Sequence, residues 1–125
     1  MAAEMVNERE IRLQDETLVQ MYLTVDGRVN RLRYFLRGLG LGLVGMVLYF
    51  VMYLAVSEVA AGILYGLVML AQIPLCIRRS HDMGKSGWWN LLLLVPLVNA
   101  IWSLFLLFKK GTEGDNAYGS DPLAE

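Results

Sequence analysis

The segment from residue 78 to residue 89 concentrates most of the ionisable side chains that this chain places between its long apolar runs. It reads Arg-Arg-Ser-His-Asp-Met-Gly-Lys-Ser-Gly-Trp-Trp, and it holds the only histidine of the 125 residues. Because an apolar run flanks it on either side, we expect a loop at a membrane surface, where one helix leaves the bilayer and the next enters. Four kinds of chemistry compete for this loop.

The first is binding of an anion or a lipid headgroup. Arg78, Arg79 and Lys85 lie together beside the membrane, and Arg28 and Arg31 are expected to reach the same surface. Guanidinium groups bind phosphate through paired hydrogen bonds, and an anionic leaflet attracts each basic residue by about 1 kcal/mol. These five residues are therefore the candidate site for acidic phospholipid. The simpler interpretation is that they flank membrane helices as topology signals.

Nucleotide binding and acid–base or metal chemistry are the second and third kinds, and the sequence disfavours both. Residues 84–86 resemble the end of a phosphate-binding loop, but that motif needs a glycine where Arg79 stands and a preceding strand. His81 and Asp82 are adjacent on an expected short loop, where neighbouring side chains rarely point at one atom. A metal set would need further histidine or cysteine ligands nearby. We predict no catalytic residue, metal or cofactor.

Architecture is the fourth and favoured interpretation. An ion pair of Asp82 with Arg78 or Arg79 is expected to hold the loop, while its glycines make the turn. The two tryptophans are expected to anchor the next helix at the membrane interface, where aromatic rings are favoured. The residues assigned to this architecture are His81, Asp82, Gly84, Gly87, Trp88 and Trp89.

Three apolar runs must position this loop, and none contains a charged residue: residues 38–56, 59–77 and 88–108. Each is close to the roughly 20 residues that a helix needs to cross a bilayer. The chain is 56% hydrophobic and 18% charged, against about 45–50% and about 25% in soluble domains. None of the runs has the polar stripe of a soluble bundle helix. The sequence therefore predicts an all-α membrane protein with three hydrophobic helical segments.

Local signals predict where these helices begin and break. Asn30 is expected to cap a helix that starts near Arg31. The only polar break between the first two runs, residues 57–58, predicts a tight hairpin, and Pro74 predicts a kink before the loop. Pro96 interrupts the third run, which is either one kinked crossing or a re-entrant hairpin with its tip at Pro96.

Charge divides the chain into an acidic N-terminal segment (1–27), a multi-pass membrane domain (28–108) and an irregular, glycine-rich C-terminal tail (109–125). The first segment is expected to be a solvated tail. With three crossings, one face holds seven basic residues and the other only Lys109 and Lys110, so the first face and the N-terminus are expected to be cytoplasmic. A re-entrant third segment would return those two lysines to the same side.

Three segments of the chain resemble one bacterial family. Gly27-Arg28, Arg31 and Tyr34-Phe35 look like its entry to the first helix, the block at 78–89 like its central motif, and residues 111–122 like its closing tail. The family is domain of unknown function 805 (DUF805), and the resemblance covers about residues 22–122. It implies a multi-pass protein of the bacterial inner membrane, and it implies no activity.

Together these observations favour a non-enzymatic membrane protein, either an accessory subunit or a lipid-interacting module. An oligomeric transport or channel component is the alternative, although its spans would be expected to carry charged groups. An enzyme acting on a lipid headgroup with His81 and Asp82 is less favoured, because catalysis needs convergent titratable groups. The expected partners are membrane lipids, including acidic phospholipid, and a second copy or another membrane protein. The net charge of −1 gives no indication of nucleic-acid binding.

Overall fold

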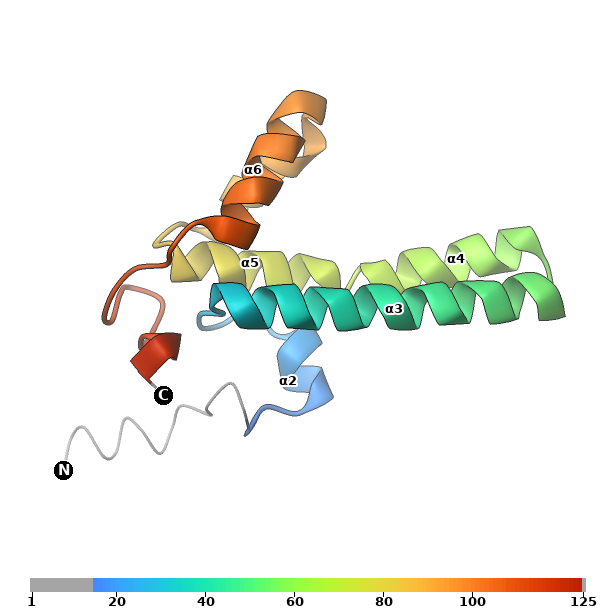
Figure 1. Ribbon diagram of the computed structural model, residues 1–125, viewed down its shortest axis with the longest axis horizontal. Helices are drawn as coiled ribbons and strands as arrows, with labels where there is room; N and C mark the ends of the chain where they lie inside the picture. The colour runs from blue at the N-terminus through green and yellow to red at the C-terminus, as the bar shows by residue number, and fades with distance from the viewer. Residues whose placement is uncertain (1–14, 125) are drawn as a thin grey trace.

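The computed structural model describes residues 15–124, and every regular element in that range is helical. In chain order the elements are α2 (Leu18–Leu23), α3 (Arg31–Ala55), α4 (Glu58–Met69), α5 (Gln72–Asp82), the 3₁₀ helix η2 (Gly87–Leu94), α6 (Pro96–Phe108) and the short 3₁₀ helix η3 (Pro122–Ala124). Figure 1 shows α4 and α5 returning along α3, and α6 leaving them at a steep angle. The predicted all-α fold with three apolar helical segments is confirmed.

α3 begins where the sequence predicts. The Asn30 side chain accepts a hydrogen bond from the backbone N–H of Arg33 at 2.9 Å, which satisfies one of the unpaired donors of the first turn. The helix then continues for 25 residues. At ~1.5 Å per residue it is longer than the roughly 30 Å hydrocarbon core of a bilayer.

The predicted hairpin after α3 is also confirmed. Ser57 caps α4 by accepting a hydrogen bond from the N–H of Ala60 at 3.1 Å. The return is broken once, at Leu70 and Ala71 between α4 and α5. Pro74 explains the break, because it has no N–H to bond the carbonyl of Leu70 and its ring crowds that carbonyl. Taken together, residues 58–82 are long and apolar enough to cross a membrane, as α3 is.

The third apolar segment is a hairpin with its turn at Val95 and Pro96. The two arms are tied by hydrogen bonds: Trp102 Nε1 donates to Asn90 Oδ1 at 3.0 Å, and Asn99 Nδ2 donates to the carbonyl of Leu93. At ~2.0 Å per residue η2 is about 16 Å long, and at ~1.5 Å per residue α6 is about 20 Å long. Neither arm reaches across a bilayer. The sequence left open one kinked crossing or a hairpin with its tip at Pro96, and the structure shows the hairpin.

The predicted loop at 78–89 is wrong in its extent. Arg78 to Asp82 form the last turns of α5, and η2 begins at Gly87, so only residues 83–86 lie outside helices. Nothing between Arg78 and Asp82 breaks a helix. Gly84, the first residue that does, has a φ of +75°, in the left-handed region that glycine adopts without steric cost.

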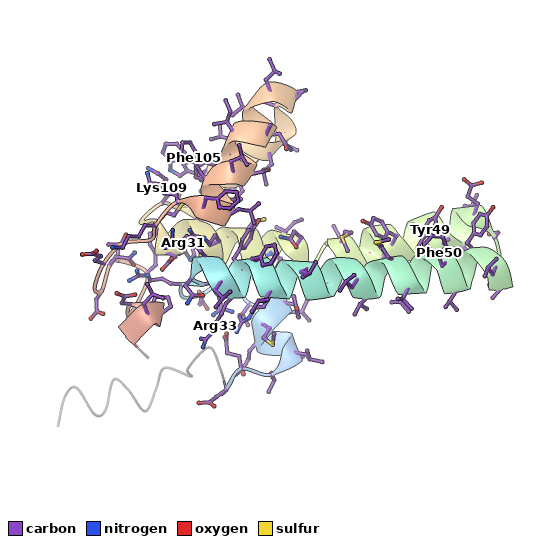
Figure 2. All side chains as sticks on the ribbon, in the orientation of Figure 1. Arg31, Arg33, Tyr49, Phe50, Phe105 and Lys109 are labelled. Atoms are coloured by element: carbon purple, nitrogen blue, oxygen red, sulfur yellow. The ribbon has the colours of Figure 1, made fainter. Side chains whose placement is uncertain are left out.

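The buried core lies at one end of the molecule. It gathers side chains from the start of α3, from α5 and from α6: Val29, Tyr34, Leu75, Cys76, Met83, Trp102 and Leu106. Figure 2 places Arg31, Arg33 and Lys109 at this end and Tyr49 and Phe50 near the other. Towards the far end of α3 and α4, large apolar side chains face outward. The polar groups and the packed core therefore share one end, where the helices and the tail converge.

Candidate functional site

Asp82 is the centre of a buried ionic cluster at this end. Its Oδ1 accepts a hydrogen bond from Arg28 Nε at 3.1 Å, and its Oδ2 accepts one from Arg79 Nη1 at 2.9 Å. The side chains of all three residues are at most 5% exposed. Arg79 lies three residues before Asp82 on α5, so helical spacing brings the two together, whereas Arg28 arrives from the segment before α3. A buried pair of this kind is stabilising only when its remaining N–H groups are also bonded.

Those remaining N–H groups bind backbone carbonyls of the end of α6 and of the tail. Arg79 Nε donates to the carbonyl of Leu106 at 2.7 Å, and Arg28 Nη1 donates to that of Gly114 at 2.6 Å. The two guanidinium groups together bond the carbonyl oxygens of Leu106, Lys109, Thr112, Gly114 and Gly119. The cluster therefore fastens the end of α6 and the tail to α3 and α5.

Glu16 forms a second ionic centre on the N-terminal side. Its carboxylate lies 3.0 Å from Arg37 Nη1 and 3.0 Å from Arg78 Nη2. Arg78 Nη1 also donates to the carbonyl of Gln20, and Tyr22 Oη donates to the carbonyl of Arg37 at 2.9 Å. From residue 15 onward the expected solvated tail is thus docked on α3 and α5; residues 1–14 lie outside the described part.

His81 points away from Asp82 and contacts the tail. Its ring stacks on Tyr118 with centroids 4.2 Å apart, and its Nδ1 lies 2.9 Å from the carbonyl oxygen of Gly27. Asn116 Nδ2 donates to the His81 carbonyl at 2.9 Å. His81 and Asp82 therefore face different partners, and their side chains do not converge on one point.

The tail is irregular, as predicted, but it is ordered by local hydrogen bonds. Asn116 and Gly119 form an isolated antiparallel bridge. The Asp121 carboxylate accepts the N–H groups of Gly114 at 2.9 Å and Leu123 at 3.0 Å. Partial burial works to raise the pKa of Asp121, but these two backbone hydrogen bonds and the charges of Arg28 and Lys110 together lower the pKa below its usual value.

The five basic residues of the candidate lipid site fall into two groups. Arg28, Arg78 and Arg79 are 4%, 3% and 0% exposed, and each is paired with one of the chain's own carboxylates. Arg31 is exposed, and Lys85 is half-buried with its Nζ 4.4 Å from the centre of the Trp89 ring. The structure thus differs from the expectation that all five face the membrane surface.

The remaining residues of the 83–89 region shape the entry to the hairpin. Gly87 packs so closely on α5 that a β-carbon there would lie 2.8 Å from Ile77 Cγ2. Trp89 stacks on Trp102 of α6 with centroids 5.8 Å apart, and Trp88 is exposed. These contacts hold the first arm of the hairpin against α5 and α6, while both tryptophans remain exposed, Trp88 at 78% and Trp89 at 45%.

Sequence reasoning missed Glu16, the second ionic centre, and Gly111, which lies beside Asp82. Glu16 belongs to an acidic stretch that precedes an arginine-rich one, and this opposition of charge was the available signal. Gly111 carries no such signal. It matters because it has no side chain where the backbone passes against Asp82, and the residues next to it in the sequence do not indicate that Asp82 lies there.

The amino-acid sequence is similar to one protein family and to two membrane proteins of known location. The family model described as "Protein of unknown function (DUF805)" matches residues 22–120. Inner membrane protein YhaI of Escherichia coli (strain K12) is 34% identical over 110 residues, which cover 85% of this chain and 92% of the relative. Inner membrane protein YhaH of the same strain is 40% identical over 65 residues, 50% of this chain and 52% of the relative. No solved structure matches the chain.

Proposed function

We propose that this chain, which belongs to the DUF805 family and is a membrane protein as predicted, is a non-enzymatic, lipid-interacting protein. The observation that carries the proposal is that both oxygens of Asp82 are bonded to arginines. A general base must reach its substrate, but the Asp82 side chain is only 5% exposed. His81, the neighbouring candidate, is held by the stack on Tyr118 and by the Gly27 carbonyl, so the two side chains do not converge on one point. These ionisable groups hold the tail in place.

The outward surface supports contact with lipid. Large apolar side chains are exposed along α3, α4 and the hairpin, including Leu54 at 82%, Val59 at 73% and Leu97 at 83%. Continuous apolar surface of this kind is rare on soluble monomers and marks a membrane or partner interface. Acyl chains would cover this apolar surface, and the exposed Asn99 of the hairpin donates a hydrogen bond within the chain, to the carbonyl of Leu93.

The hairpin also supports an orientation with both ends of the membrane unit cytoplasmic. Because α6 returns, Lys109 and Lys110 lie at the same end as the start of α3, where Arg31 Nη1 donates to the carbonyl of Phe108 at 2.9 Å. The basic residues gathered there are Arg28, Arg31, Arg33, Arg37, Arg78, Arg79, Lys85, Lys109 and Lys110. Basic residues near membrane helices favour the cytoplasmic side, so two crossings and one re-entrant hairpin satisfy the rule.

Cysteine labelling tests this topology. In a Cys76→Ala background, Ser57→Cys, Lys85→Cys and Ala117→Cys variants are treated in whole cells with a membrane-impermeant maleimide. The first is expected to react directly, and the other two only after the membrane is opened. Reaction of Ala117→Cys in intact cells would show three crossings and overturn the proposed arrangement.

The lipid interaction is tested by melting the purified protein in detergent with added phosphatidylglycerol or phosphatidylethanolamine. We expect the acidic lipid to raise the melting temperature more, because a ligand that binds the folded state stabilises it. Equal effects would contradict a specific lipid interaction. The lipids are recovered afterwards and analysed by mass spectrometry, and a newly formed headgroup product would contradict the non-enzymatic part of the proposal.

A further inference from the structure

A groove runs between the first turns of α3 and the last turns of α6, and its two ends differ in chemistry. The outer part has a volume of about 520 Å³ and is lined by Arg31 and Lys110 together with apolar side chains. The inner part, about 220 Å³, lies between α3, α5 and α6 and reaches Gln72 and Ser103. Phe35 and Leu107 line both parts, so the two parts adjoin at these side chains, and together they are called the groove below.

The outer end can accept an anion. Arg31 is exposed and donates one hydrogen bond, to the carbonyl of Phe108. Within the described residues it forms no ion pair, so its other N–H donors are available. Lys110 pairs with Glu113, but the two side chains are 58% and 78% exposed, and an ion pair so exposed is weak enough for a phosphate to displace.

The charge around this end favours an anion as well. Asp82 is the one acid that lines the groove, and both of its oxygens face arginines. The basic groups at this end are Arg28, Arg31, Arg79 and Lys110, and the acids that act on them are Asp82, Glu113 and Asp121. Four positive and three negative charges leave a net of +1.

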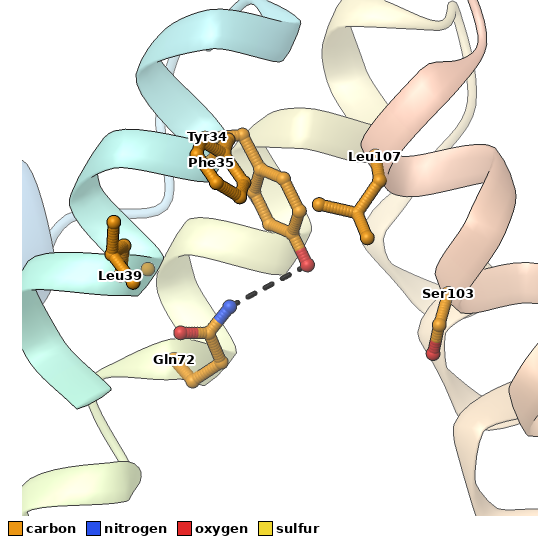
Figure 3. A pocket seen from close by; sticks show the side chains of 7 residues that line it. Tyr34, Phe35, Leu39, Gln72, Ser103 and Leu107 are labelled. Carbon is orange, nitrogen blue, oxygen red and sulfur yellow. Dashed lines mark hydrogen bonds between the residues drawn. The ribbon is translucent and has the colours of Figure 1, made fainter. Parts of the chain in front are cut away.

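The inner end is suited to an acyl chain. Figure 3 shows Phe35 and Leu39 of α3 on one side, Leu107 of α6 on the other, and Tyr34 and Gln72 between them. The amide of Gln72 donates to Tyr34 Oη at 3.5 Å, so these two polar groups bond to each other. From Arg31 to Leu39 the helix rises about 12 Å, at ~1.5 Å per residue, which is long enough for a substantial part of an acyl chain.

We propose that this groove binds one acidic phospholipid, with its phosphate at Arg31 and Lys110 and one acyl chain between Phe35 and Leu107. The inference rests on the proposed lipid-interacting function and gives it a site. An amphipathic ligand fits because the basic groups and the apolar walls lie in one groove. Lys110 was not among the basic residues that the sequence suggested for lipid, and the return of the hairpin is what brings it beside Arg31.

The test measures retained lipid. The full chain is reconstituted in vesicles of equal amounts of phosphatidylglycerol and phosphatidylethanolamine, extracted in detergent and examined by native mass spectrometry. The native protein is expected to retain phosphatidylglycerol preferentially. Arg31→Gln and Lys110→Gln should each reduce that retention by on the order of tenfold, the value of a hydrogen bond to a charged group. Gly38→Leu should reduce it by filling the inner groove without changing the charge.

Two matched controls separate the groove from the general basic surface. Lys109→Gln makes the same change of charge one residue away, at a side chain whose Nζ lies 5.7 Å from the centre of the Phe105 ring and does not line the groove. Gly42→Leu adds the same side chain one turn further along α3, where a β-carbon meets nothing within 4 Å. Both are expected to retain phosphatidylglycerol as the native protein does.

The outcomes distinguish this inference from the function on which it rests. If the native protein retains the two lipids equally, the lipid-interacting function and the groove site both fail. If the native protein prefers phosphatidylglycerol but the groove variants match their controls, only the groove site fails. Should Arg31→Gln fail to fold because its bond to Phe108 is lost, Lys110→Gln and Gly38→Leu decide the result.

Discussion

Gly111 lies directly against the carboxylate of Asp82, and a β-carbon at Gly111 would overlap Oδ2. The next residue continues the contact, since the N–H of Thr112 donates to the Asp82 carbonyl at 2.7 Å. The chain leaving α6 therefore crosses the end of α5 with only bare backbone between itself and the buried ionic cluster. No residue larger than glycine fits this crossing without moving the carboxylate away from its arginines.

Gly111→Ala should therefore release the tail. Forcing a methyl group into a packed site typically costs about 1–3 kcal/mol, and the loss should lower the melting temperature in detergent. Trypsin should also cut faster after Lys109 and Lys110 once the tail is undocked. Gly42→Ala, on an open face of α3, is the control: it should leave proteolysis unchanged and should not lower the melting temperature, because alanine is the better helix former. Equal proteolysis of the two variants would show that the tail does not depend on this contact.

Asp82→Ala should be strongly destabilising. It leaves Arg28 and Arg79 buried without their carboxylate, and breaking a buried pair by removing one partner costs on the order of 3–5 kcal/mol. Asp82→Asn should cost less, since an amide oxygen can still accept one of the two hydrogen bonds. The matched control is Glu113→Ala, which removes an exposed partner of Lys110. Its melting temperature should equal that of the native protein. A normal melting temperature for Asp82→Ala would contradict the structural role of the cluster.

His81 should contribute through its ring and not through catalysis. His81→Ala loses the stacking on Tyr118 and the contact with the Gly27 carbonyl, a loss of about 1–3 kcal/mol when the two contributions are combined. His81→Phe keeps the stacking and should lose about half as much. Thermal melting of the three proteins gives the order. A His81→Ala protein with native stability but altered bound lipid would point to chemistry at this side chain.

Asn90 should hold the hairpin to α5. Its amide donates to Ser80 Oγ at 3.0 Å, and its Oδ1 accepts from Trp102 Nε1 at 3.0 Å. Hydrogen bonds between membrane helices contribute about 0.6 kcal/mol on average and up to about 1.7 kcal/mol, so Asn90→Leu should cost far less than Asp82→Ala. A double-mutant cycle with Trp102→Phe, measured by unfolding in mixed micelles, should give a coupling energy of that size. A coupling energy of zero would show that this bond does not fix the hairpin.

Local signals were sufficient for the starts of α3 and α4, but not for the end of α5, which continues through Asp82. Asn30 and Ser57 cap the helices that follow them, and the spacing of polar breaks placed the first hairpin. Pro74 predicted the interruption on the return, although the break falls one turn before it because the proline ring acts on the carbonyl of Leu70. These features depend on residues within about four positions of each other, which a sequence displays directly.

Long-range geometry was not accessible in this way. The Asp82–Arg79 pair is local, but Arg28 meets Asp82 across 54 positions and Arg78 meets Glu16 across 62. The sequence shows which segments carry an excess of acidic or basic residues, but it does not show which of these residues form ion pairs. The third apolar run was equally ambiguous, because its length suits a single crossing while Pro96 suits a turn. Contacts distant in sequence, such as that of Arg79 with the Leu106 carbonyl, decide in favour of the hairpin.

The short hairpin also makes the molecule unequal in cross-section. At the end with the ionic cluster, α3 and α5 are joined by η2 and α6, whereas the far end consists of α3 and α4 alone. In the proposed orientation the cytoplasmic leaflet must make room for four helical segments and the opposite leaflet for two. Such a wedge fits best where the cytoplasmic leaflet is the convex, more expanded one. If the proposed orientation holds, the placement of one proline-containing turn would make the chain sensitive to the curvature of the membrane that holds it.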